Sequence, residues 1–158
     1  MFKRTIIFVS CAAVLGASAA LAAPPPNGAD REVPRLVVPE LNDIRVGDFE
    51  GKLLTEYRAW ARKHDPTAEP PGGGESRAAT VRRFLRGYRI VLDRPEPTIL
   101  VVAHGLPIRY LLNAVSRVDP APVVEQVAYA VPFKVSATEL TDAITRLEAW
   151  SATPAWRT

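Results

Sequence analysis

The chain is poor in the residues that form covalent and metal cross-links. It has one cysteine among 158 residues, Cys11, so an internal disulfide and a metal site of clustered cysteines are both excluded. It has two histidines, His64 and His104. No histidine precedes His64, which limits any chemistry that needs a pair of imidazoles early in the chain.

Long runs of one charge are also absent. Lys and Arg number 20 and Asp and Glu number 17, giving a net charge of +3. This small excess favours small anionic ligands and argues against a nucleic-acid partner. The glycine-rich residues 65–74 lack the Gly-Lys-Ser/Thr sequence that a phosphate-binding P-loop requires. A hydrophobic content of 47% and a charged content of 23% are typical of a globular domain, and the length suits one domain.

The first 23 residues allow two interpretations. A basic start, an apolar stretch and the small residues Leu21-Ala22-Ala23 are typical of a secretory signal peptide, which predicts an exported or periplasmic protein without a membrane anchor. In the alternative, residues 5–9 are a strand followed by an alanine-rich helix of the fold, and the protein is cytoplasmic. We therefore divide the chain into a signal-like segment (1–23), a proline-rich linker (24–33), a domain (34–152) and a tail (153–158).

Residues 98–115 carry the clearest pattern. The continuous apolar run 99–103 predicts a buried parallel strand, and the apolar spacing from Ile108 to Val115 predicts a helix packed on it. His104 then lies at the carboxyl end of a strand, just before a helix N-terminus. Open α/β sheets bind ligands at this place, and unpaired N–H groups attract anions there.

The remaining helices and strands are predicted from the spacing of apolar residues and from the proline and glycine residues that interrupt it. We predict helices over residues 53–64, 75–93 and 140–150, and strands over 35–39 and 123–131, with 133–136 pairing beside the latter. This alternation predicts a layered α/β fold. On the helix over 75–93, the arginines are expected to form a solvated face; they are Arg77, Arg82, Arg83 and Arg86.

Three ordered motifs, LNDIRVGDFEG at 41–51, PGGGES at 71–76 and ILVVAHGLPIRYLL at 99–112, resemble the histidine phosphatase superfamily, the phosphoglycerate-mutase-like proteins. The resemblance covers roughly residues 35–150. It implies a three-layer αβα sandwich, here incomplete at its N-terminal strand. It also implies hydrolysis or transfer of phosphate from monoesters without a metal or other cofactor, so the expected partner is a phosphorylated small molecule or phosphate.

The resemblance also implies roles for individual residues. His104 matches the second pocket histidine and, with Gly105, is expected to bind the phosphoryl group. Asp43 occupies the position of the acid that protonates the leaving oxygen, with a turn-stabilising Asp as the alternative. Glu75 and Arg109 are possible substrate contacts; a helix-start acid and a surface ion pair are the structural alternatives.

The departure from the family lies at its nucleophile. Family members end their first strand with Arg-His-Gly, whose histidine attacks phosphorus, whereas this chain has no histidine upstream of Asp43. If residues 5–11 are that strand, Ser10 and Cys11 replace Arg-His. We therefore expect a truncated phosphomonoester hydrolase domain with little or no activity. The alternatives are a non-catalytic phosphate- or partner-binding domain and a mis-started gene product.

Overall fold

The computed structural model describes residues 4–10 and 34–156. Strands are β1 (Thr5–Ser10), β2 (Thr98–Ala103) and β3 (Pro132–Ser136). Helices are α1 (Leu54–Ala61), α2 (Arg77–Leu92), α3 (Gly105–Val115) and α4 (Ala137–Ala152), and two short 3₁₀ turns are η1 (Pro39–Leu41) and η2 (Gly47–Phe49). The predicted helices are present, each with ends that differ by a few residues.

The described strands form one mixed sheet in the order β2-β1-β3. β1 lies in the middle, parallel to β2, with Ser10 opposite Ala103, and antiparallel to β3. Its side chains alternate between the two faces, which places Ile6 and Phe8 in the core with exposures of 0% and 1%. The central strand of the sheet is therefore the most N-terminal element of the chain.

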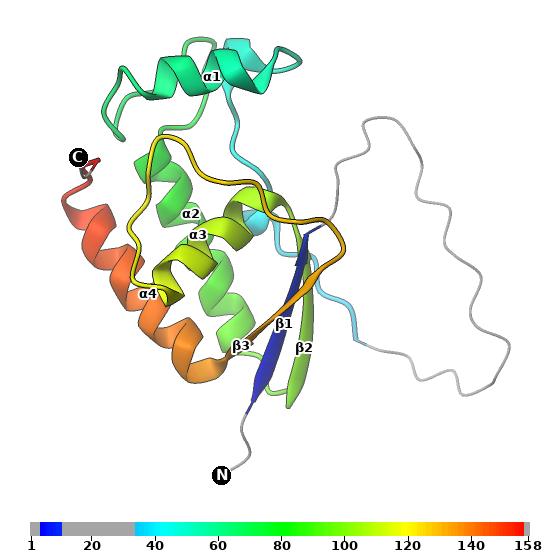
Figure 1. Cartoon of the computed structure of the whole chain (residues 1–158). Coiled ribbons are helices and arrows are strands. Elements are labelled where there is room, and N and C mark those ends of the chain that lie inside the picture. Colours follow the sequence, from blue (N-terminus) through cyan, green and yellow to red (C-terminus); the bar gives the residue numbers. More distant parts are fainter. Residues whose placement is uncertain (1–3, 11–33, 157–158) are drawn as a thin grey trace, which may run out of the picture.

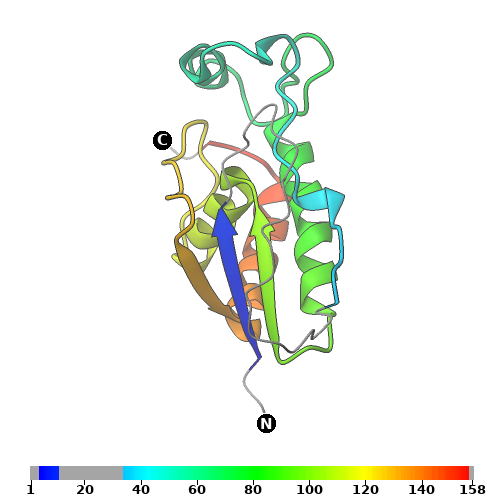
Figure 2. The ribbon, with the colours of Figure 1, turned by 90° about the vertical axis from the view of Figure 1, so that its right-hand side faces the viewer.

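Helices α2, α3 and α4 pack together on one face of this sheet (Figure 1; Figure 2). On the opposite face, Leu100 and Val102 of β2 are 64% and 60% exposed. The α/β class is thus confirmed, and the described residues supply two of the three expected layers.

A small cap, defined here as residues 47–74, lies beyond the carboxyl ends of β1 and β2 (Figure 1). It contains η2 and α1 and is closed by hydrogen bonds from Asp48 N to Pro71 O (2.8 Å) and from Glu75 N to Arg45 O (2.7 Å). Gly47 has a positive φ, and a Cβ there would lie 2.1 Å from Pro71 O. Glycine is required at this position because both the backbone conformation and the space exclude a side chain.

Two predicted strands are wrong. Residues 34–38 have no regular structure and lead into η1, and Leu36 and Val37 are exposed. Flanking prolines lack the N–H groups that a ladder needs. The apolar run 123–131 is also irregular, apart from an isolated bridge of Tyr129 to Ser10. Its carbonyl groups accept hydrogen bonds from arginine side chains instead of from a neighbouring strand.

The described N-terminal residues form a strand of the fold, as in the second of the two interpretations of residues 1–23. Residues 5–10 form β1, one residue longer than the strand of that interpretation. The expected cleavage region and the alanine-rich segment fall within residues 11–33, outside the described residues. Signal removal remains a prediction, and it would take the central strand out of this sheet.

Arg83 of α2 holds the segment that leads into the cap. Its guanidinium donates to both carboxylate oxygens of Glu75 (2.8 and 2.7 Å) and to three carbonyl groups, those of Glu40, Asn42 and Asp43 (2.8, 2.8 and 2.9 Å). With these five hydrogen bonds, the Arg83 side chain is only 16% exposed. The expectation of a mostly solvated arginine face is therefore wrong for Arg83, because every N–H group of its guanidinium has a protein partner.

We predict that Phe8→Ala lowers the free energy of unfolding by about 3–5 kcal/mol, since the fully buried ring leaves a cavity between β1 and the helices. Ile7→Ala is the matched control. Ile7 is half-buried on the other face of the same strand, so its loss should cost about 1 kcal/mol. Urea denaturation of the full chain measures both values. Equal, negligible effects would show that β1 is not part of the folded domain.

We also predict an acid-dependent contribution from Glu75. Hydrogen bonding to Arg83 lowers the pKa of Glu75, more than burial raises it. The unfolded chain therefore takes up the proton first as the pH falls, so this stabilisation is complete above the usual glutamate pKa of about 4.3 and is lost as the pH falls through the lowered value. Between about pH 6 and pH 3, the free energy of unfolding should fall less steeply with pH for Glu75→Gln than for the wild type. Glu56→Gln, at an exposed position of α1, should leave the slope unchanged.

Candidate functional site

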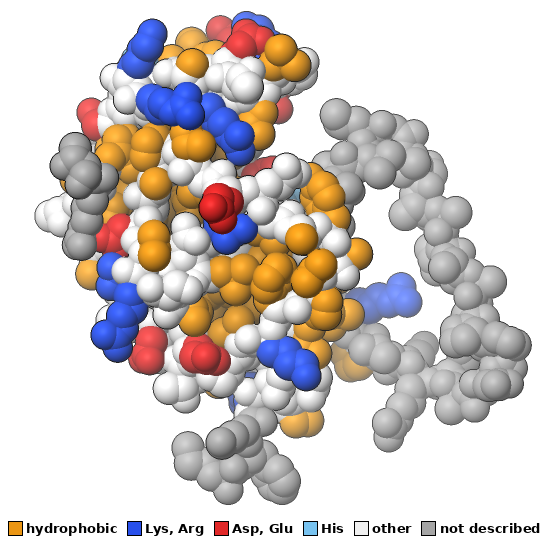
Figure 3. Space-filling model, viewed as in Figure 1, with side chains coloured by type: hydrophobic (Ala, Val, Ile, Leu, Met, Phe, Trp, Pro, Cys, Tyr) orange, Lys and Arg blue, Asp and Glu red, His pale blue; other side chains and the backbone are white. Residues whose placement is uncertain are grey.

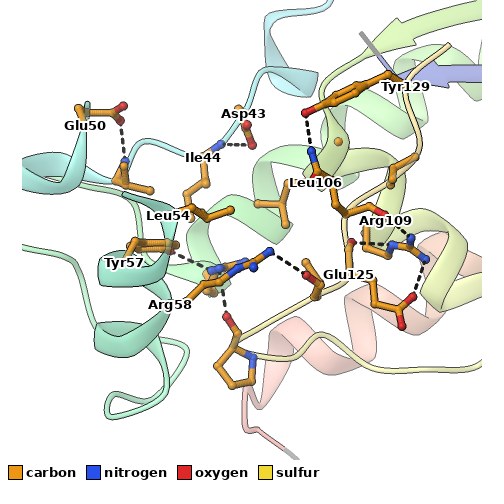
Figure 4. A pocket seen from close by; sticks show the side chains of 17 residues that line it. Asp43, Ile44, Glu50, Leu54, Tyr57, Arg58, Leu106, Arg109, Glu125 and Tyr129 are labelled. Atoms are coloured by element: carbon orange, nitrogen blue, oxygen red, sulfur yellow. Dashed lines mark hydrogen bonds and ion pairs between the residues drawn. The ribbon is translucent and has the colours of Figure 1, made fainter. Parts of the chain in front are cut away.

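A cleft of about 300 Å³ separates the cap from the body of the domain. One wall comes from residues 43–46, Glu50 and α1; the other comes from the start of α3 and the segment 122–129 (Figure 4). On the face seen in Figure 3, acidic and basic side chains lie side by side among hydrophobic ones. The cleft is thus a mixed polar and apolar site at the carboxyl end of the sheet.

His104 connects β2 to α3 and is the N-cap residue of that helix, with an extended backbone. Its side chain is partly buried and makes no capping hydrogen bond. The next two residues, Gly105 and Leu106, line the cleft, whereas His104 itself does not. The predicted strand-end position is confirmed, and a phosphate-binding role stays a prediction.

The end of β1 lies beside the start of α3. Ser10 is 1% exposed, and its Oγ atom has no hydrogen-bond partner among the described residues. A Cβ built on Gly105 would lie 3.8 Å from this oxygen. Ser10 therefore occupies the end of the first strand, where the family resemblance places the arginine of Arg-His-Gly; Cys11 lies outside the described residues.

Asp43 lines the opposite wall of the cleft and is exposed. Its Oδ1 accepts a hydrogen bond from the N–H of Ile44 (3.0 Å), while its carbonyl oxygen accepts one from Arg83. The side chain thus holds a local turn, as the structural alternative requires, and the carboxylate still faces the site (Figure 4). The two alternatives for Asp43 are compatible in this geometry.

Arg77, the first residue of α2, is buried at the floor between the two walls with 6% exposure. Its guanidinium donates to the hydroxyls of Tyr57 (2.9 Å) and Tyr110 (2.7 Å) and to the carbonyl of Pro122 (3.3 Å). Burial raises the pKa of Tyr57, and the charge of Arg77 offsets this only in part. The Tyr57 hydroxyl therefore stays neutral near pH 7 and can accept from the guanidinium.

Two further arginines line the cleft and are tied to the segment 122–129. Arg58 of α1 donates to Val124 O (3.3 Å). Arg109 of α3 donates to Glu125 O (2.9 Å) and Gln126 O (3.0 Å), and its Nη1 lies 4.0 Å from the Glu125 carboxylate. The surface ion pair expected for Arg109 is thus present, although its main partners are backbone carbonyls.

The charges of the lining balance. Arg58, Arg77 and Arg109 face Asp43, Glu50 and Glu125. Since Glu50 and Glu125 are exposed and water screens them, the buried charge of the cleft is the cation Arg77. This arrangement can orient an anionic ligand through guanidinium and backbone donors.

His64 lies away from the cleft, beyond the end of α1. Its ring stacks on Trp60 with centroids 4.3 Å apart, Nδ1 is 2.8 Å from Trp60 O, and its own carbonyl accepts from Trp156. The predicted helix-end position is confirmed. The ring is held by structural contacts at a place where it does not line the cleft.

Glu75 does not line the cleft either. It is 8% exposed, precedes the N-cap Ser76 of α2, and lies in a second hollow on the other side of that helix. The structure therefore places the Glu75 carboxylate outside the cleft, although Arg83 Nη2 joins it to the carbonyl group of Asp43. A direct contact of Glu75 with a substrate in the cleft would require a different arrangement of this segment.

The sequence interpretation missed Arg77 and Arg58. Arg77 was expected on a solvated face, yet it lines up with Val81, Phe84 and Tyr88 at helical spacing, on the buried stripe of α2. The apolar periodicity contained this signal, and the charge of arginine masked it. For Arg58, on the half-exposed side of α1, no comparable signal exists.

Within the part of the chain that the structure describes, no group of three His, Cys, Asp or Glu side chains could hold a metal ion. Among the described helices, none combines the length and apolar character needed to cross a bilayer.

Comparisons with known proteins agree with the motifs. A search of curated proteins and a search of solved structures each gave no match. The family model of the histidine phosphatase superfamily (branch 1) matches residues 22–153, most of the chain and both walls of the cleft. The chain therefore belongs to the histidine phosphatase superfamily.

Proposed function

We propose that the cleft binds the phosphoryl group of a phosphorylated small molecule and that this chain hydrolyses phosphomonoesters slowly or not at all. The observation that carries the proposal is the position of the two histidines. His104 lies at the strand end beside the cleft, and His64 is held at the far end of α1. One imidazole near the cleft can bind phosphate, but the chemistry that the family resemblance implies uses two.

Phosphate binding would use the start of α3. Gly105 and Leu106 are the first two residues of this helix, where N–H groups have no intrahelical acceptor. Pro107 follows and has no N–H group, so these two amides are the donors that the first turn offers. Together with the His104 ring they form a set of donors suited to phosphate oxygens.

Turnover needs two further groups. In the mechanism implied by the resemblance, a histidine nitrogen forms a bond to phosphorus while the bond from phosphorus to the ester oxygen breaks, and an acid protonates that oxygen. Asp43 is our candidate for the acid, because its carboxylate lies across the cleft from α3. For the attacking group, the end of β1 offers Ser10, whose hydroxyl is buried and has no hydrogen-bond partner among the described residues. Turnover should therefore be slow.

A non-catalytic phosphate-binding domain is the second candidate function. It rests on the same position of His104 and differs only in the absence of turnover. Binding and hydrolysis must therefore be measured separately.

For binding, we predict that orthovanadate and phosphate bind the full chain, and that His104→Ala weakens binding by about tenfold or more because a donor to the anion is lost. Isothermal titration measures the Kd. His64→Ala is the matched control, since it removes the other imidazole at a place outside the cleft and should leave the Kd unchanged. Equal binding by wild type and His104→Ala would contradict the proposed site.

For turnover, we predict that the purified chain gives no acid-labile phosphorylated histidine when it is incubated with radiolabelled substrate, and at most slow release of p-nitrophenol from p-nitrophenyl phosphate. The reason is the lack of a second imidazole at the cleft. Label and turnover that survive in His64→Ala but disappear in His104→Ala would show that His104 is the nucleophile and that the chain is an active enzyme.

A further inference from the structure

A second hollow lies on the side of α2 opposite to the cleft. Its volume is about 440 Å³, and its lining is strongly charged, with Arg45, Arg82, Arg83 and Arg86 facing Glu69 and Glu75. The rest of the lining is small: two glycines, a serine and an alanine. Arg86 follows Arg77 by nine residues, which is half a turn out of phase on a helix. The hollow and the cleft therefore use different faces of the same helix.

The two glutamates do not neutralise the four arginines. Both oxygens of Glu75 accept hydrogen bonds from Arg83, so this pair is internally balanced. Arg45 is farther from Glu75, with 3.8 Å between Nη2 and Oε1, and its side chain is 75% exposed. Three guanidinium groups, those of Arg45, Arg82 and Arg86, thus share Glu69 as the remaining carboxylate.

Arg82 and Arg86 stand one turn apart on α2, where like charges destabilise a helix. Their partners are weak: Arg82 Nη1 is 3.5 Å from Ser151 O, and Arg86 Nη1 is 3.3 Å from Arg82 O. Neither makes an ion pair with a carboxylate of the described residues, whereas Arg89 on the same helix pairs with Glu148. The positive charges of Arg82 and Arg86 are therefore left without a paired carboxylate among the described residues where α2 borders the hollow.

We propose that this hollow binds a polyphosphate group, that is, two or more linked phosphates that contact Arg45, Arg82 and Arg86 together. Guanidinium groups bind phosphate oxygens through paired N–H donors, and three of them call for an anion with more than one phosphate. The described lining contains no aromatic or large aliphatic side chain, which disfavours recognition of an apolar group or a base. This site is separate from the phosphoryl site proposed for the cleft and does not depend on it.

The test uses inorganic tripolyphosphate as the probe and isothermal titration of the full chain. Arg82→Ala/Arg86→Ala should weaken binding by about tenfold or more, and added salt should weaken binding by the wild type. Both side chains are exposed, so the variant should fold, which thermal unfolding checks. As the matched control, Arg62→Ala/Lys63→Ala removes two exposed positive charges after α1, outside the hollow, and should change the Kd by less than about twofold.

A third variant separates the two sites. His104→Ala should leave tripolyphosphate binding unchanged, even if it abolishes binding of orthovanadate. The proposal is overturned if the Arg82/Arg86 variant binds tripolyphosphate like the wild type, if the Arg62/Lys63 control loses as much affinity, or if His104→Ala alone abolishes binding. Tighter binding of a poly-glutamate peptide of equal charge would also overturn it in favour of an acidic protein partner.

Discussion

The buried guanidinium of Arg77 is the contact on which the cleft depends. It contacts α1 through Tyr57, α3 through Tyr110 and the segment 122–129 through the carbonyl oxygen of Pro122. Three parts of the chain that are distant in sequence therefore meet at one cation. A buried guanidinium is tolerated only when its donors are satisfied. Here two hydroxyls, a carbonyl and the faces of the Tyr57 and Tyr110 rings surround it.

Arg83, six residues later on α2, binds the segment that leads into the cap, as Arg77 binds Tyr57 within the cap. Its fork holds Glu75 and the carbonyls of the segment that carries Asp43. Asp43, the acid proposed for proton transfer, is therefore positioned by α2 through its backbone carbonyl. Its carboxylate accepts a hydrogen bond from the N–H of Ile44 instead. Together the two arginines connect α2 to both ends of the cap, through Tyr57 and through the segment that carries Asp43.

Membership of the histidine phosphatase superfamily explains the strand and helix around His104. The strand-end turn, the first two amides of α3 and the acidic residue across the cleft form an arrangement that can hold phosphate. The end of β1 carries a buried serine hydroxyl without a partner among the described residues. The proposals of phosphate binding and of covalent transfer thus rest on different groups of this protein, the first on α3 and the second on the end of β1.

The sequence by itself determined the α/β class, the strand and helix around His104 and the family, because apolar periodicity and three ordered motifs are local properties of the chain. It also determined that only two imidazoles exist. Tertiary structure decided the rest. Residues 123–131 form no strand because arginines of α1 and α3 take their carbonyl groups, and Arg77 is buried because two tyrosines from other helices converge on it. The spacing of Arg77 on the buried stripe of α2 is a local pattern, but the partners that its guanidinium finds depend on the approach of distant segments.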